Sequence, residues 1–412
     1  MALLAVLAVG VLGSSCDDDA SETEPVSTST ESSPDTSNTT PVPSTERAPT
    51  TSDAAPPTVG ATTPEPVTGP TGTTITTFGI DDGLPASGLD AVEVGPDGTV
   101  WAGVRPVSGG TDGWTWARLD GGRFVEIPTS PAWGAEHAAG LDGELWIFGP
   151  PGFDIPQGVQ HFDGTDWSFD PGARISFGTV GSDGTLFGFD VLRDPEGEAP
   201  MSFAVLDRGA WTELPAPPRE VVAADPAIAP DGTLWVRTER GLAWFDGTEW
   251  TTTVDLGPDA FEAFSHVTAG EFRLGADGTA WMLYSDDELG PAWLRLADGT
   301  VERRAIDLAS LPFDDECDVA DADRLPLPTD PAEATFAIAP LIAGFGGDTE
   351  GRLWTATTCL GVTRTDPITG ELQVFTTADG MPTLGFGDLA AHPDGSVWVA
   401  TDSGLVRIAS ND

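Results

Sequence analysis

The strongest constraint on the fold is a short motif that returns seven times. It consists of an acidic residue, a glycine, two further residues and an aromatic side chain, as in PDGTVW at residues 96–101. Successive copies lie 41 to 48 residues apart, except for one interval of 73. A period near 45 residues is typical of a four-stranded propeller blade, so the sequence predicts an all-β, seven-bladed β-propeller. The seven glycines are Gly98, Gly143, Gly184, Gly232, Gly278, Gly351 and Gly395, and the aromatic residues are Trp101, Trp146, Phe187, Trp235, Trp281, Trp354 and Trp398.

Each part of the motif has a physical role in a blade. The Asp-Gly pair is expected to form a tight hairpin turn, in which glycine adopts the positive φ that other residues resist. The aromatic residue then begins the second strand and is expected to pack between adjacent blades. A second hairpin of the same type follows in several units, at residues 161–167, 244–250 and 295–301. Each unit therefore predicts four strands, A to D, joined in order.

The two ends of the repeat region predict how the ring closes. The last unit ends at residues 404–412, which supply a third strand and no fourth. Residues 73–79 precede the first strand A and have no unit of their own. Placing residues 73–79 as the outer strand of the last blade completes seven blades and leaves no open sheet edge.

Residues 81–104 and 379–408 have closely similar sequence patterns. Each begins with DGLP or DGMP, which is followed by an apolar strand, the DG pair and a Trp. The second stretch continues to Gly404, Leu405 and Arg407. This pattern resembles the two-component regulator propeller repeat, and Gly241 and Leu242 fit it as well. The resemblance implies a seven-bladed sensor propeller or a free-standing secreted version of one. The chain has no kinase or transmitter segment, so a kinase role does not carry over.

The N-terminal segment predicts export and a lipid anchor. Residues 1–13 form one apolar run, which is too short to span a membrane and long enough for the apolar part of a signal segment. Ser14 and Ser15 before Cys16 resemble the bacterial lipobox, in which Cys16 would receive lipid. Gly13 stands where Leu is usual and no basic residue precedes the run, which favours a start codon annotated too late. A buried apolar strand is the alternative.

These features divide the chain into a signal segment at 1–15, a tether at 16–72 and the propeller at 73–412. The tether is rich in Ser, Thr, Pro and acidic residues, and is expected to be disordered because it cannot bury enough apolar surface to fold. A coil of roughly 55 residues spans about 40 Å. The resulting protein is expected to be a monomer outside the cytoplasm, anchored to the bacterial membrane.

The 73-residue interval holds an inserted acidic loop at residues 307–336. It falls between strand D of one blade and strand A of the next, on the face where the B–C loops also emerge. Cys317 in this loop and Cys359 in the following B–C loop are predicted to form a disulfide, which would contribute about 3–4 kcal/mol. The loop's carboxylates would suit Ca²⁺, although their spacing matches no EF-hand and a solvated acidic loop is the simpler interpretation. These residues are Asp314, Asp315, Glu316, Asp318, Asp321 and Asp323.

Charge and histidine placement bear on function. With 66 acidic and 18 basic residues the net charge is −48, which would repel phosphate backbones and argues against nucleic acid as a partner. The four histidines (His137, His161, His266 and His392) show no metal-ligand spacing, and the sequence reveals no hydrogen-bond partner for a general base. The chain is therefore predicted to be a cell-surface lipoprotein that binds a protein or glycan without catalysis or a cofactor. The alternatives are a secreted enzyme, similar to streptogramin lyases or acting on glycans, and a structural cell-wall protein.

Overall fold

The chain divides into two units, Met1–Thr58 and Val59–Asp412, and the second holds all of the described structure. The computed structural model describes residues 67–69 and most of 72–410. The longer stretches outside the description are 106–112, 132–135, 150–157, 171–174, 191–201, 219–225, 256–271 and 306–340. Within the described residues no helix is long and apolar enough to cross a membrane.

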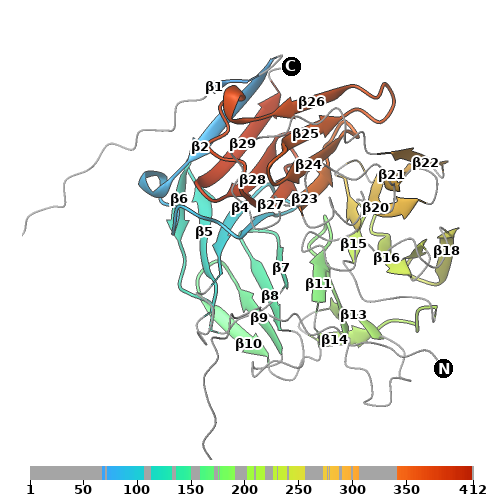
Figure 1. Ribbon diagram of the computed structural model, residues 1–412. Helices are drawn as coiled ribbons and strands as arrows, with labels where there is room; N and C mark the ends of the chain where they lie inside the picture. The colour runs from blue at the N-terminus through green and yellow to red at the C-terminus, as the bar shows by residue number, and fades with distance from the viewer. Residues whose placement is uncertain are drawn as a thin grey trace, which may run out of the picture. The chain divides into compact units, whose positions relative to one another are not determined.

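The described strands form seven antiparallel sheets, which confirms the predicted seven-bladed propeller (Figure 1). Two short 3-10 turns, η1 (Ile80–Asp82) and η5 (Thr377–Asp379), precede the first and last blades. Blade 1 contains β3 (Ala91–Val94), β4 (Val100–Val104), β5 (Thr115–Asp120) and β6 (Arg123–Glu126). Blade 2 contains β7 (Glu136–Ala139), β8 (Leu145–Gly149), β9 (Gly158–Phe162) and β10 (Trp167–Asp170). Blade 3 contains β11 (Phe177–Val180), β12 (Leu186–Asp190), β13 (Ser202–Asp207) and β14 (Ala210–Glu213).

The remaining blades follow the same order. Blade 4 contains β15 (Ala227–Ile228), β16 (Leu234–Thr238), β17 (Gly241–Phe245) and β18 (Trp250–Asp255). Blade 5 contains β19 (Phe272–Leu274), β20 (Ala280–Asp286), β21 (Gly290–Ala297) and β22 (Thr300–Ala305). Blade 6 contains β23 (Ile342–Gly347), β24 (Leu353–Thr357), β25 (Gly361–Thr365) and β26 (Leu372–Phe375). Blade 7 contains β27 (Phe386–Ala391), β28 (Val397–Thr401) and β29 (Gly404–Ser410), with β2 (Thr73–Phe78) and β1 (Val67–Thr68) on its outer side.

The ring closes through the N-terminal strand, as the sequence predicts. β2 pairs antiparallel with β29 from Thr73↔Ser410 to Phe78↔Leu405, and Figure 1 shows the blue β2 beside the red β29. The first strand of each blade contacts the first strand of the next, in a cycle that returns from β27 to β3. One detail differs from the sequence prediction. β1 pairs with β2, so regular structure begins at Val67, inside the segment expected to be tether.

The Asp-Gly turns are stabilised by the aspartate side chains themselves. In five blades the Oδ1 atom of the turn aspartate accepts a hydrogen bond of 2.9–3.0 Å from the backbone N–H two residues later; these aspartates are Asp97, Asp183, Asp231, Asp277 and Asp394. The following glycine has a φ of +81° at Gly98 and +84° at Gly395, in the region that favours glycine. The motif therefore recurs because its carboxylate and its glycine together build one turn.

The aromatic residue of the motif packs against the next blade. Trp101 is fully buried in a cluster with Leu145 and Ile147 of blade 2, and Trp398 lies in a cluster with Val92 and Val100 of blade 1. An arginine on the neighbouring strand covers the ring in four blades. The pairs are Trp101–Arg118, Trp281–Arg295, Trp354–Arg364 and Trp398–Arg407, with the guanidinium carbon 5.5–5.9 Å from the ring centroid. This arrangement explains the arginine that follows Gly404 and Leu405 in the repeat.

Candidate functional site

Four ionisable side chains on the innermost strands form what we term the axial cluster, consisting of Glu93, His137, Arg273 and Asp388. They stand on β3, β7, β19 and β27, the first strands of four different blades. First strands begin where the D–A loops end, and each of the four side chains lies in the first three residues of its strand. Glu93 and Arg273 pair with the blade aromatics Trp101 and Trp281, close to the Asp-Gly turns. His137 and Asp388 pair with residues one and two positions beyond the aromatic. The axial cluster therefore lies along the innermost strands rather than at one end of the ring.

His137 and Glu93 form the central contact of the cluster. The Nδ1 atom of His137 lies 2.8 Å from Oε1 of Glu93, across the interface between blades 2 and 1. The edges of two tryptophan rings hold the imidazole, with centroid distances of 5.2 Å to Trp114 and 4.9 Å to Trp116. The side chain of His137 is 14% exposed, and among the described residues its Nε2 atom has no hydrogen-bond partner. Glu93 thus orients the ring through Nδ1.

Asp388 is the most strongly perturbed carboxyl of the cluster. It follows a β-bulge between Phe386 and Asp388, which turns the side chain toward blade 1. Its Oδ2 atom accepts a hydrogen bond of 3.2 Å from the backbone N–H of Val92, and Oδ1 accepts one of 2.8 Å from Leu389. Burial, followed by the negative charge of Glu93, raises the pKa of Asp388 to about 6, against the opposing charges of Arg273 and His137.

Burial alone would lower the pKa of His137. The hydrogen bond to Glu93 and the charges of Glu93 and Asp388 outweigh it and raise that pKa above its ordinary value of 6.5. The axial cluster therefore contains a carboxyl and an imidazole whose pKa values are both raised above their ordinary values. Groups of this kind bind hydrogen-bonding ligands and transfer protons, and they concentrate at functional sites.

Sequence reasoning missed this cluster, because the sequence revealed no hydrogen-bond partner for a general base, whereas the structure supplies Glu93 for His137. His161 lies on β9, stacked on Trp146 with ring centroids 3.7 Å apart. His392 lies before the last Asp-Gly turn, with Nε2 3.0 Å from the carbonyl oxygen of Gly98. His266 lies outside the described residues.

The other predicted site residues are largely in parts of the chain that the structure does not describe. Cys16, Cys317 and the six loop carboxylates from Asp314 to Asp323 all lie outside the described residues. Cys359 is fully buried just before β25 with a φ of +70°, and its pairing with Cys317 stays a prediction. Among the residues that are described, no three His, Cys, Asp or Glu side chains form a group that could hold a metal ion.

The Asp-Gly turns differ from the axial cluster in how their carboxylates are bonded. The carboxylates of Asp183 and Asp231 accept hydrogen bonds within their own turns, chiefly from the backbone N–H groups of Thr185 and Thr233, which lowers their pKa values. These aspartates therefore stabilise the turns of the fold.

Comparisons with solved structures show the same fold. The structure of a streptogramin B lyase aligns with a TM-score of 0.51 at 14% identity, covering 82% of this chain and 98% of that one. The extracellular domain of a one-component system from B. thetaiotaomicron aligns with a TM-score of 0.47 at 13% identity, covering 81% of this chain and 39% of that one. YCF48 bound to D1 peptide also gives 0.47 at 13% identity, with 86% and 98% covered. No protein-family model matches the sequence, and neither does any curated protein.

Proposed function

We propose that this protein is a binding propeller that works outside the cytoplasm and recognises a glycan or a peptide at the axial cluster. The observation that carries the proposal is the convergence of Glu93, His137 and Asp388 from the innermost strands of three blades. Their arrangement offers an imidazole oriented through Nδ1, whose Nε2 has no hydrogen-bond partner among the described residues, and a partly protonated carboxyl. Such groups donate hydrogen bonds to, and accept hydrogen bonds from, the hydroxyl and amide groups that glycans and peptides carry.

The test is a binding screen with glycan and peptide panels, followed by calorimetry on matched variants. Glu93→Gln and His137→Gln are expected to weaken binding at least tenfold. His137→Gln removes the imidazole that would hydrogen-bond the ligand, and Glu93→Gln removes the carboxylate that orients this imidazole. Asp231→Asn, at an Asp-Gly turn, is the control and should bind as the wild type does. Equal affinity in all the variants would place the binding site elsewhere and refute the proposal.

A secreted lyase-like or glycan-acting enzyme is the second candidate, and one observation favours it. A histidine held through Nδ1 by a carboxylate, with Nε2 unoccupied, is the arrangement of a general base. The fold is also that of a streptogramin B lyase. Product formation by the wild type, abolished in His137→Gln, would establish catalysis. Binding without turnover across the same panel would favour the recognition role.

The lipid anchor at Cys16 rests on the lipobox-like residues before it, and the sensor role rests on the repeats at 81–104 and 379–408. We expect the wild-type protein in the membrane fraction and Cys16→Ala in the culture medium. A Cys16→Ala protein that stays with the membrane would contradict the anchor. For the sensor role, we expect a ligand found in the panel to change gene expression in the producing cell only when the protein is present.

The Cys317–Cys359 disulfide is proposed on the export expected for the chain and on the complete burial of Cys359. Mass spectrometry of non-reduced peptides should find the two cysteines linked. Alkylation of both thiols without prior reduction would contradict the pairing.

A further inference from the structure

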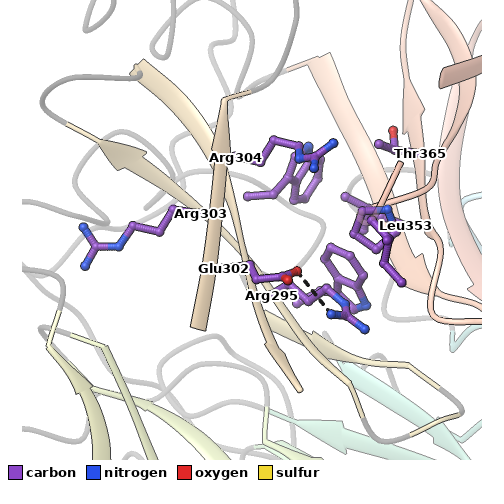
Figure 2. A pocket seen from close by; sticks show the side chains of 10 residues that line it. Arg295, Glu302, Arg303, Arg304, Leu353 and Thr365 are labelled. Carbon is purple, nitrogen blue, oxygen red and sulfur yellow. Dashed lines mark hydrogen bonds and ion pairs between the residues drawn. The ribbon is translucent and has the colours of Figure 1, made fainter. Parts of the chain in front are cut away.

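A pocket of about 360 Å³ lies between blades 5 and 6 and shares no residue with the axial cluster (Figure 2). One side is formed by β20, β21 and β22 of blade 5, and the other by β24, β25 and the turn that follows β25. Its volume is within the range of small-molecule sites. The side chains that matter to the argument are Trp293, Arg295, Glu302, Arg304, Pro367 and Ile368.

Arg304 gives the pocket its charge. Glu302 and Arg304 alternate with Arg303 on β22, so they share one face of the strand while Arg303 takes the other. Figure 2 shows Arg304 extending toward blade 6. Nη1 of Arg304 lies beside Gly370, whose φ of +75° favours glycine. Arg304 forms no ion pair with a carboxylate in the described part of the chain.

The carboxylates of Glu302 and Asp366 beside the pocket already have partners within the protein. Oε2 of Glu302 lies 3.2 Å from Nη1 of Arg295. Asp366, just before the pocket's turn, accepts backbone hydrogen bonds of 2.7 Å from Ile368 and 2.9 Å from Thr369. In addition, the buried Nε of Arg295 has no hydrogen-bond partner among the described residues. In a chain with 66 acidic and 18 basic residues, an arginine beside a pocket that has no carboxylate partner among the described residues offers a charged donor to an external anion.

The rest of the lining is apolar. The ring of Trp293 is 8% exposed and packs against Phe345, with centroids 5.5 Å apart. Ile368 is 77% exposed at the pocket's edge, next to Pro367. An apolar wall opposite a guanidinium suits a ligand that has one anionic group and one hydrophobic body.

We propose that this pocket binds a small organic carboxylate, with Arg304 pairing with the carboxylate and Trp293 and Ile368 packing against its apolar body. The site is separate from the axial cluster, so it stands or falls independently of the function proposed above. Arg304 is a binding residue here, and Arg295 supplies a second donor.

The test is calorimetry on the propeller chain with 3-phenylpropionate, the neutral 3-phenylpropionamide and inorganic phosphate. We expect 3-phenylpropionate to bind with a Kd of about 1 mM or tighter. The amide should bind at least tenfold more weakly because it cannot form the charge-assisted pair. Arg304→Gln should weaken 3-phenylpropionate at least tenfold. Arg123→Gln, which removes the same charge at an exposed position of β6, should bind as the wild type does.

Three results would overturn the proposal. Equal binding of the acid and the amide would exclude a carboxylate site. Equal losses in Arg304→Gln and Arg123→Gln would show only a general effect of charge. Phosphate binding as tightly as 3-phenylpropionate would mean that the apolar wall contributes nothing. Since the side chain of Arg304 is exposed, the variant is expected to fold, which its melting temperature checks directly.

Discussion

Asp388 provides the sharpest test of the electrostatics at the ring axis. Its pKa is raised from 3.8 to about 6, chiefly by burial and then by Glu93. A carboxyl whose pKa is higher in the folded state than in the unfolded state stabilises the fold below pH 3.8 and loses that contribution as the pH rises through 6. At about 1.4 kcal/mol for each tenfold change in the ionisation constant, ionised Asp388 costs the fold ~3 kcal/mol at pH 8.

The perturbation is Asp388→Asn, which removes the charge and keeps the shape. The amide retains one acceptor for the two backbone N–H groups of Val92 and Leu389, so it loses one hydrogen bond, worth about 1 kcal/mol at every pH. The pH-dependent part is the readout. Relative to the wild type, the free energy of unfolding of the variant should rise by ~3 kcal/mol between pH 4 and pH 8. For a domain of this size that corresponds to a change of about 4 °C in Tm.

Urea denaturation at intervals from pH 4 to pH 8 measures this difference, and titrating groups that do not interact with Asp388 cancel between the two proteins. Asp120→Asn at the exposed end of β5 is the control, and its difference from the wild type should be constant. A constant difference for Asp388→Asn over the same range would refute the reasoning, because it would mean that the Asp388 carboxyl is solvated in the folded protein.

Three further predictions concern the axis, the ring closure and the blade packing. Glu93→Gln should lower the pKa of His137, because the hydrogen bond and the negative charge of Glu93 are the main causes that raise it. An NMR titration of His137 should show a lower midpoint in the variant. An unchanged midpoint would contradict the contact between the two side chains. Deleting residues 67–78 should lower the unfolding free energy by at least ~3 kcal/mol, because Ile75 and Phe78 are buried and β29 becomes an open edge. The control is a deletion of residues 20–60. Equal melting temperatures for the two deletions would count against closure of the ring by β2. Trp101→Ala should destabilise by about 3–5 kcal/mol and the partly exposed Trp146→Ala by less, measured by urea denaturation; the reverse order would contradict the packing described here.

The architecture was predictable because its information is local and repeated. The Asp-Gly turn is made by residues adjacent in the chain, such as Asp97, Gly98 and Thr99, so each copy carries its own evidence. The closing strand was predictable because residues 73–79 had no unit of their own and the last blade lacked one strand. β1 was missed, because Val67 and Thr68 stand in a Pro-, Thr- and Glu-rich segment without alternating apolar residues, and only the exposed edge of β2 gives them a pairing partner.

The axial cluster was not predictable in the same way, because its members are far apart in the sequence. His137 and Glu93 are separated by 44 residues, and Asp388 and Val92 by 296. No spacing rule joins such positions; only the closed ring brings β27, β3 and β7 together. A signal was nevertheless present. Innermost strands carry mostly small or apolar residues, so the ionisable side chains within AVEV, EHAA and FGDLAA were exceptions.

The positions equivalent to Asp388 in other blades sharpen its significance. Asp388 pairs with Ala400, two residues after the blade aromatic, and the same register position holds Ala91 in blade 1, Phe177 in blade 3 and Gly344 in blade 6. The repeat therefore tolerates a small or apolar side chain there, and a blade with one would avoid the ~3 kcal/mol that ionised Asp388 costs near neutral pH. A costly group that the fold does not require is more consistent with a site under selection for function than with packing. Ligand binding at the axial cluster should therefore depend on the protonation of Asp388, and Asp388→Asn should alter the affinity and its pH dependence while making the protein more stable at pH 8.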